Sequence, residues 1–168
     1  MKNSLTPERL RQVLSYETDS GVFRWIASVG VVKQGAIAGC KGSHGYIQIC
    51  IDRRLYLAHR LAWLYVHGSW PTRQLDHIDG DKKNNRIVNL REVTNAENHQ
   101  NTRRPRSNSQ SGFLGVSLHK QTGRWLAQIM VLGRKKHLGL FDTAEEAHGV
   151  YLAAKSKLHP FQTLVEAA

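Results

Sequence analysis

Cysteine and long apolar runs are scarce in this sequence. Only two of its 168 residues are cysteine, Cys40 and Cys50, and they do not form a C-x-x-C pair. This count excludes a scaffold of several disulfides and a four-cysteine zinc site. No apolar run approaches the roughly 20 residues that a membrane-spanning helix needs, and the polar N-terminus lacks the apolar region of a signal peptide. We therefore expect a cytoplasmic protein that is not secreted, has no membrane partner and keeps both thiols reduced.

Acidic residues are few relative to basic ones. The chain has 13 Asp and Glu against 24 Lys and Arg, which gives a formal net charge of +11 and a pI near 10.1. The positive excess occurs in both halves of the sequence. Such a field attracts polyanions, and the release of their counterions makes nucleic acid the default partner. Composition therefore favours a nucleic-acid-binding protein with basic surface in more than one place.

The N-terminal part predicts a helix, a strand and a loop. Thr6, which precedes a proline, is typical of an N-cap, so we expect a short helix whose apolar face ends in Leu14. Residues 22–25 indicate a strand, and residues 28–44, rich in glycine and small side chains, indicate a loop. We treat residues 1–44 as a lead-in whose role the sequence leaves open.

A hairpin and a helix are expected next. Apolar and polar residues alternate over residues 47–51, which indicates a half-buried strand, and residues 55–58 can pair back on it. From His59 the apolar residues follow helical spacing until Gly68 ends the helix. His59 and Arg60 lie where strand gives way to helix. For His59 two roles stay open, a buried or capping histidine and an accessory group near the DNA or the catalytic loop.

Residues 75–101 contain the side chains best suited to chemistry. Hydrolysis of a phosphodiester needs a divalent ion to stabilise the phosphate and a base to activate water. Asp76 offers a carboxylate, which hard cations prefer, and His77 is the obvious base because histidine exchanges protons near neutral pH. Asn89 can bridge the loop between two expected strands. A helix with a capping box at Thr94 follows, and its Asn98 can face back to Asp76.

Simpler explanations exist for parts of this stretch. Asp-Gly and Asn-Asn pairs usually form turns, and we treat Asp79 and Asp81 as turn residues. A calcium loop does not fit, because Gly80 lies four residues after Asp76 and no bidentate glutamate follows at the twelfth position. As an ordered set, the residues favour a nuclease site over a structural loop.

The order Asp-His-x-Asp-Gly, Asn-Asn, Asn-Leu-Arg and Asn over residues 75–101 resembles the HNH family of phage and intron homing endonucleases. It matches the branch in which Asp-His and a final Asn replace the metal-binding histidines of other branches. The preceding hairpin and the Ala-His-Arg-Leu-Ala-Trp helix extend the resemblance over residues 45–101. It implies a metal-dependent DNA endonuclease that leaves 3′-hydroxyl and 5′-phosphate ends, and, for a phage-encoded enzyme, a place in the cytoplasm of a bacterial host.

The same resemblance assigns roles to four residues. It implies that Asp76 and Asn98 bind one divalent cation, Mg²⁺ or another ion such as Mn²⁺. It also implies that His77 is the general base and that Asn89 orients the loop and this base. One such site cleaves one strand per visit, so nicking by a monomer and double-strand cleavage by a homodimer both stay open.

Residues 103–111 form a basic linker by composition, because they are polar and contain a proline. Three arginines there either contact DNA or belong to a solvated hinge: Arg103, Arg104 and Arg106. Beyond the linker, alternating residues predict three antiparallel strands, and a capping box at Thr143 predicts a covering helix. The segments Ser-Gly-Phe-Leu-Gly-Val, Gly-Arg-Trp and His-Leu-Gly-Leu-Phe in this part resemble the AP2 DNA-binding domain.

The AP2 resemblance implies a sheet that lies in the major groove of DNA. Alternation independently places one set of side chains on the outer face of this sheet, if Trp125 and Ala127 face the helix. The residues expected to contact DNA here are Ser117, His119, Lys120, Arg124, Gln128, Met130, Lys135 and His137. Several differ from their counterparts in plant AP2 domains, so the base preference of those domains does not transfer. The alternative is a solvated sheet face.

The sequence therefore predicts an α+β protein in which an N-terminal hairpin and helix lead into a ββα-metal nuclease unit, followed by a small three-stranded antiparallel sheet plus helix. The expected parts are a lead-in (1–44), the nuclease domain (45–102), the linker (103–111) and the AP2-like domain (112–160). We expect a metal-dependent endonuclease of duplex DNA. The rivals are a non-catalytic DNA-binding regulator that uses the AP2-like domain and an RNA-binding protein.

Overall fold

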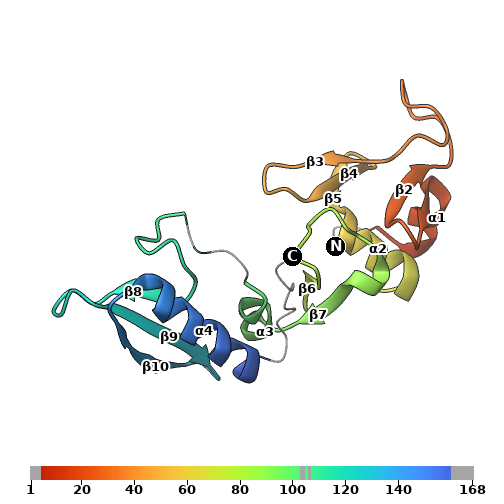
Figure 1. Cartoon of the computed structure of the whole chain (residues 1–168). Coiled ribbons are helices and arrows are strands. Elements are labelled where there is room, and N and C mark those ends of the chain that lie inside the picture. The colour runs from red at the N-terminus through yellow and green to blue at the C-terminus, as the bar shows by residue number, and fades with distance from the viewer. Residues whose placement is uncertain (1–4, 103–104, 106, 160–168) are drawn as a thin grey trace. The chain divides into compact units, whose positions relative to one another are not determined.

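The computed structural model describes residues 5–102, 105 and 107–159, and the chain forms two compact units (Figure 1). The first unit is Met1–Val93 and the second is Thr94–Ala168. Both combine short helices with small antiparallel sheets, which confirms the expected α+β class. Within the described ranges, no helix has the length and apolar character needed to cross a bilayer.

The first unit begins with a helix and a two-stranded hairpin. Its first elements are α1 (Pro7–Val13), β1 (Leu14–Glu17) and β2 (Val22–Trp25), and the two strands pair antiparallel. Thr6 caps α1 as predicted, since its hydroxyl accepts the N–H of Arg9 at 3.2 Å. The expectation that Leu14 extends the helix is wrong, because its backbone is extended and pairs with Trp25. Leu14 is fully buried all the same, so its apolar character did not distinguish helix from strand.

A three-stranded sheet and a second helix follow. The elements are β3 (Cys40–Lys41), β4 (Ile47–Ile51), β5 (Arg54–Leu57) and α2 (Ala58–His67), with strand order β3-β4-β5. The turn between β4 and β5 places Asp52 and Arg53 at φ 48° and 63°, both in the left-handed region as in a type I′ hairpin. α2 ends at Gly68 in the same region. The expected hairpin and helix are confirmed, whereas the loop expected over residues 28–44 contains the short strand β3.

One apolar core joins these elements. Leu10 of α1, Phe23 of β2 and Leu61 of α2 are buried in the same cluster. Leu90, from the segment expected to hold the nuclease site, belongs to it as well. The segment expected as a lead-in therefore contributes side chains to the core that supports the expected nuclease site.

The segment expected to form the nuclease motif is a strand, a loop and a strand. Its elements are β6 (Gln74–His77), the single 3₁₀ turn η1 (Ile87–Asn89) and β7 (Leu90–Val93). β6 and β7 pair antiparallel, with Asp76 opposite Arg91 and His77 opposite Leu90. The chain then enters α3 (Asn95–Gln100), the first helix of the second unit. This is the strand–strand–helix order expected from the sequence.

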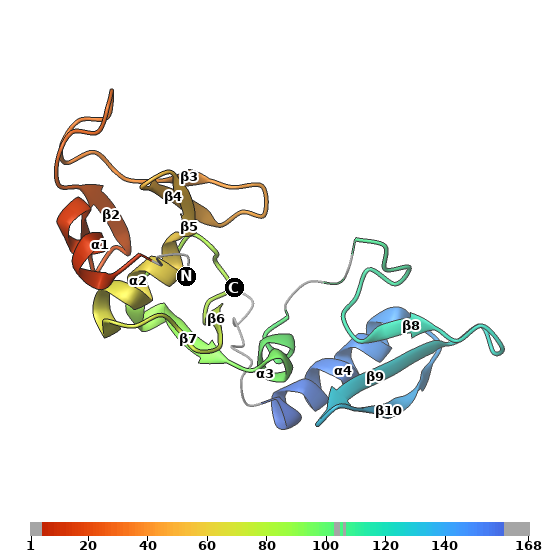
Figure 2. The same ribbon diagram turned by 180° about the vertical axis from the view of Figure 1, so that it is seen from behind.

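The second unit places one helix against a three-stranded sheet (Figures 1 and 2). Its later elements are β8 (Val116–Leu118), β9 (Trp125–Val131), β10 (Arg134–Phe141) and α4 (Ala144–Leu158), with strand order β10-β9-β8. Ala127 from β9 and Ala147 from α4 are fully buried between them. Lys155 of α4 is also buried and donates to the carbonyl of Thr102 at 2.6 Å. This bond ties the C-terminal helix to the segment that follows α3.

Candidate active site

Two adjacent residues at the end of β6 face opposite ways. Successive side chains of a strand alternate between its faces, and Asp76 and His77 do so here. Asp76 shares a face with its cross-strand partner Arg91, whereas His77 packs against rings from α2 and the loop before β4. Both are nearly buried, with exposed fractions of 9% and 4%. The strand end thus holds a carboxylate and an imidazole in separate environments.

Arg91 fixes the position of the Asp76 carboxylate. Its Nε and Nη2 lie 3.1 and 2.9 Å from Oδ2 of Asp76, a charge-assisted pair of bonds that defines direction as well as distance. Sequence reasoning gave Arg91 no role, although a cross-strand arginine is a natural partner for a buried carboxylate.

The ring of His77 is surrounded by aromatic groups. Its centroid lies 5.1 Å from that of His59 and 5.9 Å from that of Tyr46. Nε2 of His77 is 3.2 Å from Oδ1 of Asn85. Burial and the negative charge of Asp76 raise the pKa of Tyr46, so this phenol stays neutral beside the site.

His59 is a neutral packing partner of His77. Burial, with smaller contributions from His77 and Arg60, lowers the pKa of His59 to about 3. Its Nδ1 is buried and has no hydrogen-bond partner among the residues that the structure describes. Arg60 points elsewhere, since its guanidinium lies 5.8 Å from the centre of the Trp70 ring. At neutral pH His59 is therefore uncharged and interacts with His77 through ring packing.

Asn89 bridges the loop between β6 and β7. Its Nδ2 donates to Oδ1 of Asp79 at 2.9 Å and to the carbonyl of Asn84 at 2.8 Å, while its Oδ1 accepts the N–H of Asp79 at 3.0 Å. Burial opposes the charge on Asp79, but bonds from Asn89, Asn84 and the N–H of Asp81 outweigh it and lower the pKa of Asp79. Asp79 and Asp81 each accept a backbone N–H two residues later, as turn residues do.

Asn98 lies one turn into α3. The helix begins with a capping box, in which the Thr94 hydroxyl accepts the N–H of Glu97 and the Glu97 carboxylate accepts the N–H of Thr94. This confirms the capping box read from the sequence. Asn98 belongs to the second unit, whereas Asp76, His77 and Asn89 belong to the first.

Among the described parts of the chain, no group of three or more His, Cys, Asp or Glu side chains could hold a metal ion. Amide oxygens such as that of Asn98 do not belong to these residue types, so the ligand pair expected at Asp76 and Asn98 stays a prediction.

The outer face of the second sheet holds most of the residues expected to contact DNA. Cross-strand register puts His137 opposite Gln128, Lys135 opposite Met130, and Ser117 opposite Leu126. Residues on β9 that alternate with these are buried against α4. Lys120 lies in the turn after β8. The structure thus gathers polar and basic side chains on the face that α4 leaves uncovered.

Two of these residues have local partners. Arg124 forms an exposed ion pair with Asp142 at 2.8 Å, and Nδ1 of His119 lies 2.9 Å from the Thr122 hydroxyl. Arg103, Arg104 and Arg106 of the linker lie outside the described residues.

Comparison with known proteins identifies the family. The family model described as HNH endonuclease matches residues 56–100. Protein 3.8 of Escherichia phage T7 is 30% identical over 102 residues, which are 60% of this chain and 83% of that protein. The chain belongs to the HNH endonuclease family. The HNH resemblance stated from the sequence is confirmed, and the chain is an enzyme that hydrolyses DNA phosphodiester bonds.

Two further known proteins are similar to this HNH endonuclease, one in part of its sequence and one in its structure. APETALA2-like protein 2 of Oryza sativa is 46% identical over 57 residues, which are 33% of this chain and 13% of the plant protein. The solved structure of the HNH homing endonuclease I-HmuI covers 86% of this chain and 80% of its own, at 22% identity and a TM-score of 0.44.

Sequence reasoning missed one neighbour of the HNH histidine. Asn85, only 3% exposed, approaches His77 through its amide, yet the Asn84-Asn85 pair was read as part of a motif without a role for either side chain. The available signal was weak, because an Asn-Asn pair in a loop is ordinarily a turn.

Proposed function

We propose that this chain is a metal-dependent endonuclease of duplex DNA, a phage-type homing or free-standing HNH enzyme. The observation that supports this most is the buried pair Asp76 and His77 at the end of β6, beside a loop that Asn89 bridges. Protein 3.8 comes from a phage, which supports a phage origin here and a site of action in the cytoplasm of a bacterial host.

We propose that Asp76 and Asn98 hold the divalent cation, Mg²⁺ or a similar ion such as Mn²⁺. A carboxylate and an amide oxygen are hard donors, and together they leave positions for water and for a phosphate oxygen. Such an ion would stabilise the charge that develops on the phosphate and on the leaving oxygen.

His77 is the general base in this proposal. It takes a proton from the attacking water, and its ring is held in place by the neutral rings of His59 and Tyr46. Asn89 acts through the loop, because its three bonds fix the segment that follows His77. The phosphodiester would be cut to leave 3′-hydroxyl and 5′-phosphate ends.

The outer face of the second sheet is proposed as the DNA-docking surface. Gln128 and His137 can bond to base edges, while Lys135 suits phosphate. The identity to a segment of the rice protein supports an AP2-like assignment for this part. The linker residues Arg103, Arg104 and Arg106 would add phosphate contacts.

A plasmid-cleavage assay tests the proposal. Supercoiled plasmid would be incubated with the full chain and Mg²⁺, Mn²⁺ or EDTA, beside the variants His77→Ala and Asp76→Ala. His67→Ala is the matched control, since His67 is an exposed histidine of the same unit. We expect cleavage with metal, none with EDTA, and loss of cleavage in the two site variants while gel-shift binding persists.

The product distribution separates the open alternatives. Open circles would indicate nicking by a monomer, and linear DNA would indicate a homodimer or a second encounter. Binding without cleavage on DNA that contains a selected binding site, with every metal tried, would instead favour the DNA-binding regulator. Tighter binding of RNA than of duplex DNA at matched salt would contradict DNA as the substrate.

A further inference from the structure

The contact between Asn85 and His77 determines which ring nitrogen can accept a proton. Nδ2 of Asn85 donates to the carbonyl of Lys83 at 3.2 Å, so Oδ1 is the atom that faces Nε2 of His77 at 3.2 Å. An amide oxygen only accepts hydrogen bonds. In the neutral ring Nε2 must therefore be the protonated nitrogen, and the basic lone pair is on Nδ1.

Asn85 is itself held by the N-terminal hairpin. The hydroxyl of Tyr16, on β1, donates to the carbonyl of Asn85 at 2.7 Å in the interior of the unit. Burial raises the pKa of Tyr16 to about 12, so this donor is present throughout the physiological range. The backbone of Gly21 packs directly on the same residue, because a Cβ at Gly21 would lie 2.6 Å from the carbonyl carbon of Asn85.

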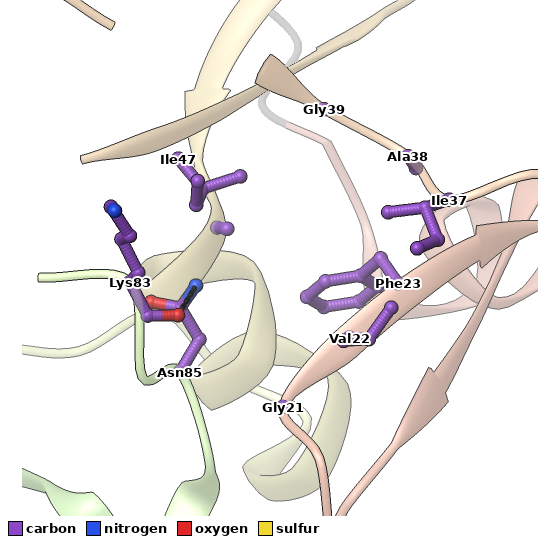
Figure 3. A pocket seen from close by; sticks show the side chains of 10 residues that line it. Gly21, Val22, Phe23, Ile37, Ala38, Gly39, Ile47, Lys83 and Asn85 are labelled. Carbon is purple, nitrogen blue, oxygen red and sulfur yellow. Dashed lines mark hydrogen bonds between the residues drawn. The ribbon is translucent and has the colours of Figure 1, made fainter. Parts of the chain in front are cut away.

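Figure 3 shows the same junction from the side of a pocket of about 180 Å³. Phe23 and Val22 of β2 line one side of this pocket, and Lys83 and Asn85 of the loop line the other. The loop therefore rests on β2 through packing and on β1 through a hydrogen bond.

We propose that Asn85 is a positioning residue of this nuclease, which holds His77 with its proton on Nε2 and its lone pair on Nδ1. The hairpin of β1 and β2 is the support that keeps Asn85 in place, through Tyr16 and Gly21. This inference rests on the proposed role of His77 as general base. It gives the N-terminal segment a part in catalysis that the sequence left open.

¹⁵N NMR spectroscopy tests the hydrogen bond between His77 and Asn85 without any measurement of cleavage. The metal-free full chain, with ¹⁵N-labelled histidine, would be examined at about pH 8, above the ordinary histidine range. The signals of His77 among the nine histidines would be identified by their absence in His77→Ala. We expect a hydrogen-bonded Nε2–H that exchanges slowly with solvent, in the wild type and in Asn85→Asp, which retains an acceptor oxygen. In Asn85→Leu this proton should exchange rapidly.

Either of two results would overturn the contact. One is a proton on Nδ1 of His77 in the wild type, and the other is equal protection of Nε2–H in the wild type and Asn85→Leu. The NMR measurement needs neither metal nor DNA, so it tests the Asn85–His77 contact even if the chain cleaves no DNA. Failure of this contact can therefore be distinguished from failure of the proposed nuclease activity.

Kinetics tests the catalytic consequence. We expect Asn85→Leu to lower kcat about 100-fold with little change in KM, which is the lower end of what a positioned general base contributes. Asn85→Asp should recover part of this loss. An unchanged kcat in Asn85→Leu would refute the proposal.

Tyr16 supplies a variant that removes one oxygen only. Tyr16→Phe should lower kcat several-fold, and Tyr65→Phe is the matched control, because the Tyr65 ring packs on those of Tyr16 and Phe23 in the same core. Equal activity of these two variants would exclude the hairpin as the support of Asn85.

Discussion

At the scale of single residues, His59 is a buried histidine whose ring packs on that of His77 in the nuclease motif. The surroundings of His59 keep its ring neutral down to acid pH, since burial lowers its pKa to about 3. Its ring packs edge to face on His77 and also contacts Tyr46. His59 is thus a structural neighbour whose own protonation opposes folding.

The pH dependence of stability follows from this shift. Between pH 6.5 and about 3 the unfolded chain binds a proton at His59 that the folded chain does not. Stability from this group is therefore complete above pH 6.5 and lost as the pH falls, by up to about 1.4 kcal/mol per pH unit. We predict that His59→Phe, which keeps a ring in place, flattens the decline of the unfolding free energy between pH 6.5 and 4. Urea unfolding at several pH values measures this, and an unchanged slope would contradict it.

The bridging role of Asn89 gives a second prediction. Asn89→Ala removes two hydrogen bonds with Asp79 and one with the carbonyl of Asn84, and the partly buried Asp79 carboxylate loses one of its donors. We expect the free energy of unfolding to fall by about 1–3 kcal/mol, with loss of cleavage. Asn108→Ala, at an exposed position, should change stability by less than about 0.5 kcal/mol. Equal unfolding midpoints in urea for the two variants would show that the bridge is not needed.

The role of a site residue can be predicted from the sequence only where its side chain has few alternative uses. Asp76 and His77 were identifiable because carboxylate and imidazole suit metal and base chemistry and stand together before a loop. Asn85 was not, because the same side chain forms turns, caps and bridges, and only its position against His77 and Tyr16 selects among these roles. The contact between Asp76 and Arg91 likewise depends on strand register, which no local pattern states.

At the scale of elements, the turn before β8 is packed tightly on α4. Gly115 has φ +72°, and a Cβ there would overlap the ring of Tyr151, whereas Gly123 has φ +69° but open space around it. The two glycines thus share a backbone conformation and differ in their neighbours.

This pair allows a matched comparison. Gly115→Ala and Gly123→Ala both place alanine at positive φ, which costs about 1 kcal/mol. We predict that only Gly115→Ala adds a steric cost, of roughly 1–3 kcal/mol, because the buried Tyr151 ring must move. Thermal unfolding of both variants measures the difference, and equal losses would contradict the packing described here.

Elements with explicit boundary signals were predictable. The caps at Thr6 and Thr94 and the stop at Gly68 lie where the sequence placed them. The start of β1 at Leu14 was not predictable, because a buried leucine suits helix and strand equally and the pairing with β2 decides between them. β3 is only two residues long, too short to show an alternating pattern.

At the scale of the whole molecule, the net charge of +11 favours DNA binding, and the number of phosphates contacted sets how that binding responds to salt. Each phosphate contact that is lost should reduce the slope of log K against log salt by about 0.9. We predict this reduction for Lys135→Ala, because Lys135 is exposed on the outer sheet face.

Lys157→Ala is the control for this measurement, since Lys157 is an exposed lysine of α4, which covers the other face of the sheet. Fluorescence anisotropy on a labelled duplex at several salt concentrations gives both slopes. A larger change for Lys157→Ala than for Lys135→Ala would place the docking surface on the helix side.

The buried bond from Lys155 to the carbonyl of Thr102 limits how this protein can exchange parts with its relatives. A recombination junction within residues 103–111 would replace the C-terminal helix by that of a relative. The carbonyl of Thr102 would then lose the buried ammonium of Lys155 as its donor. A junction near Val93 keeps that pair together. Helix α3 should therefore be exchanged together with the sheet proposed to dock on DNA, and chimeric nucleases made from this chain should be joined before Thr94.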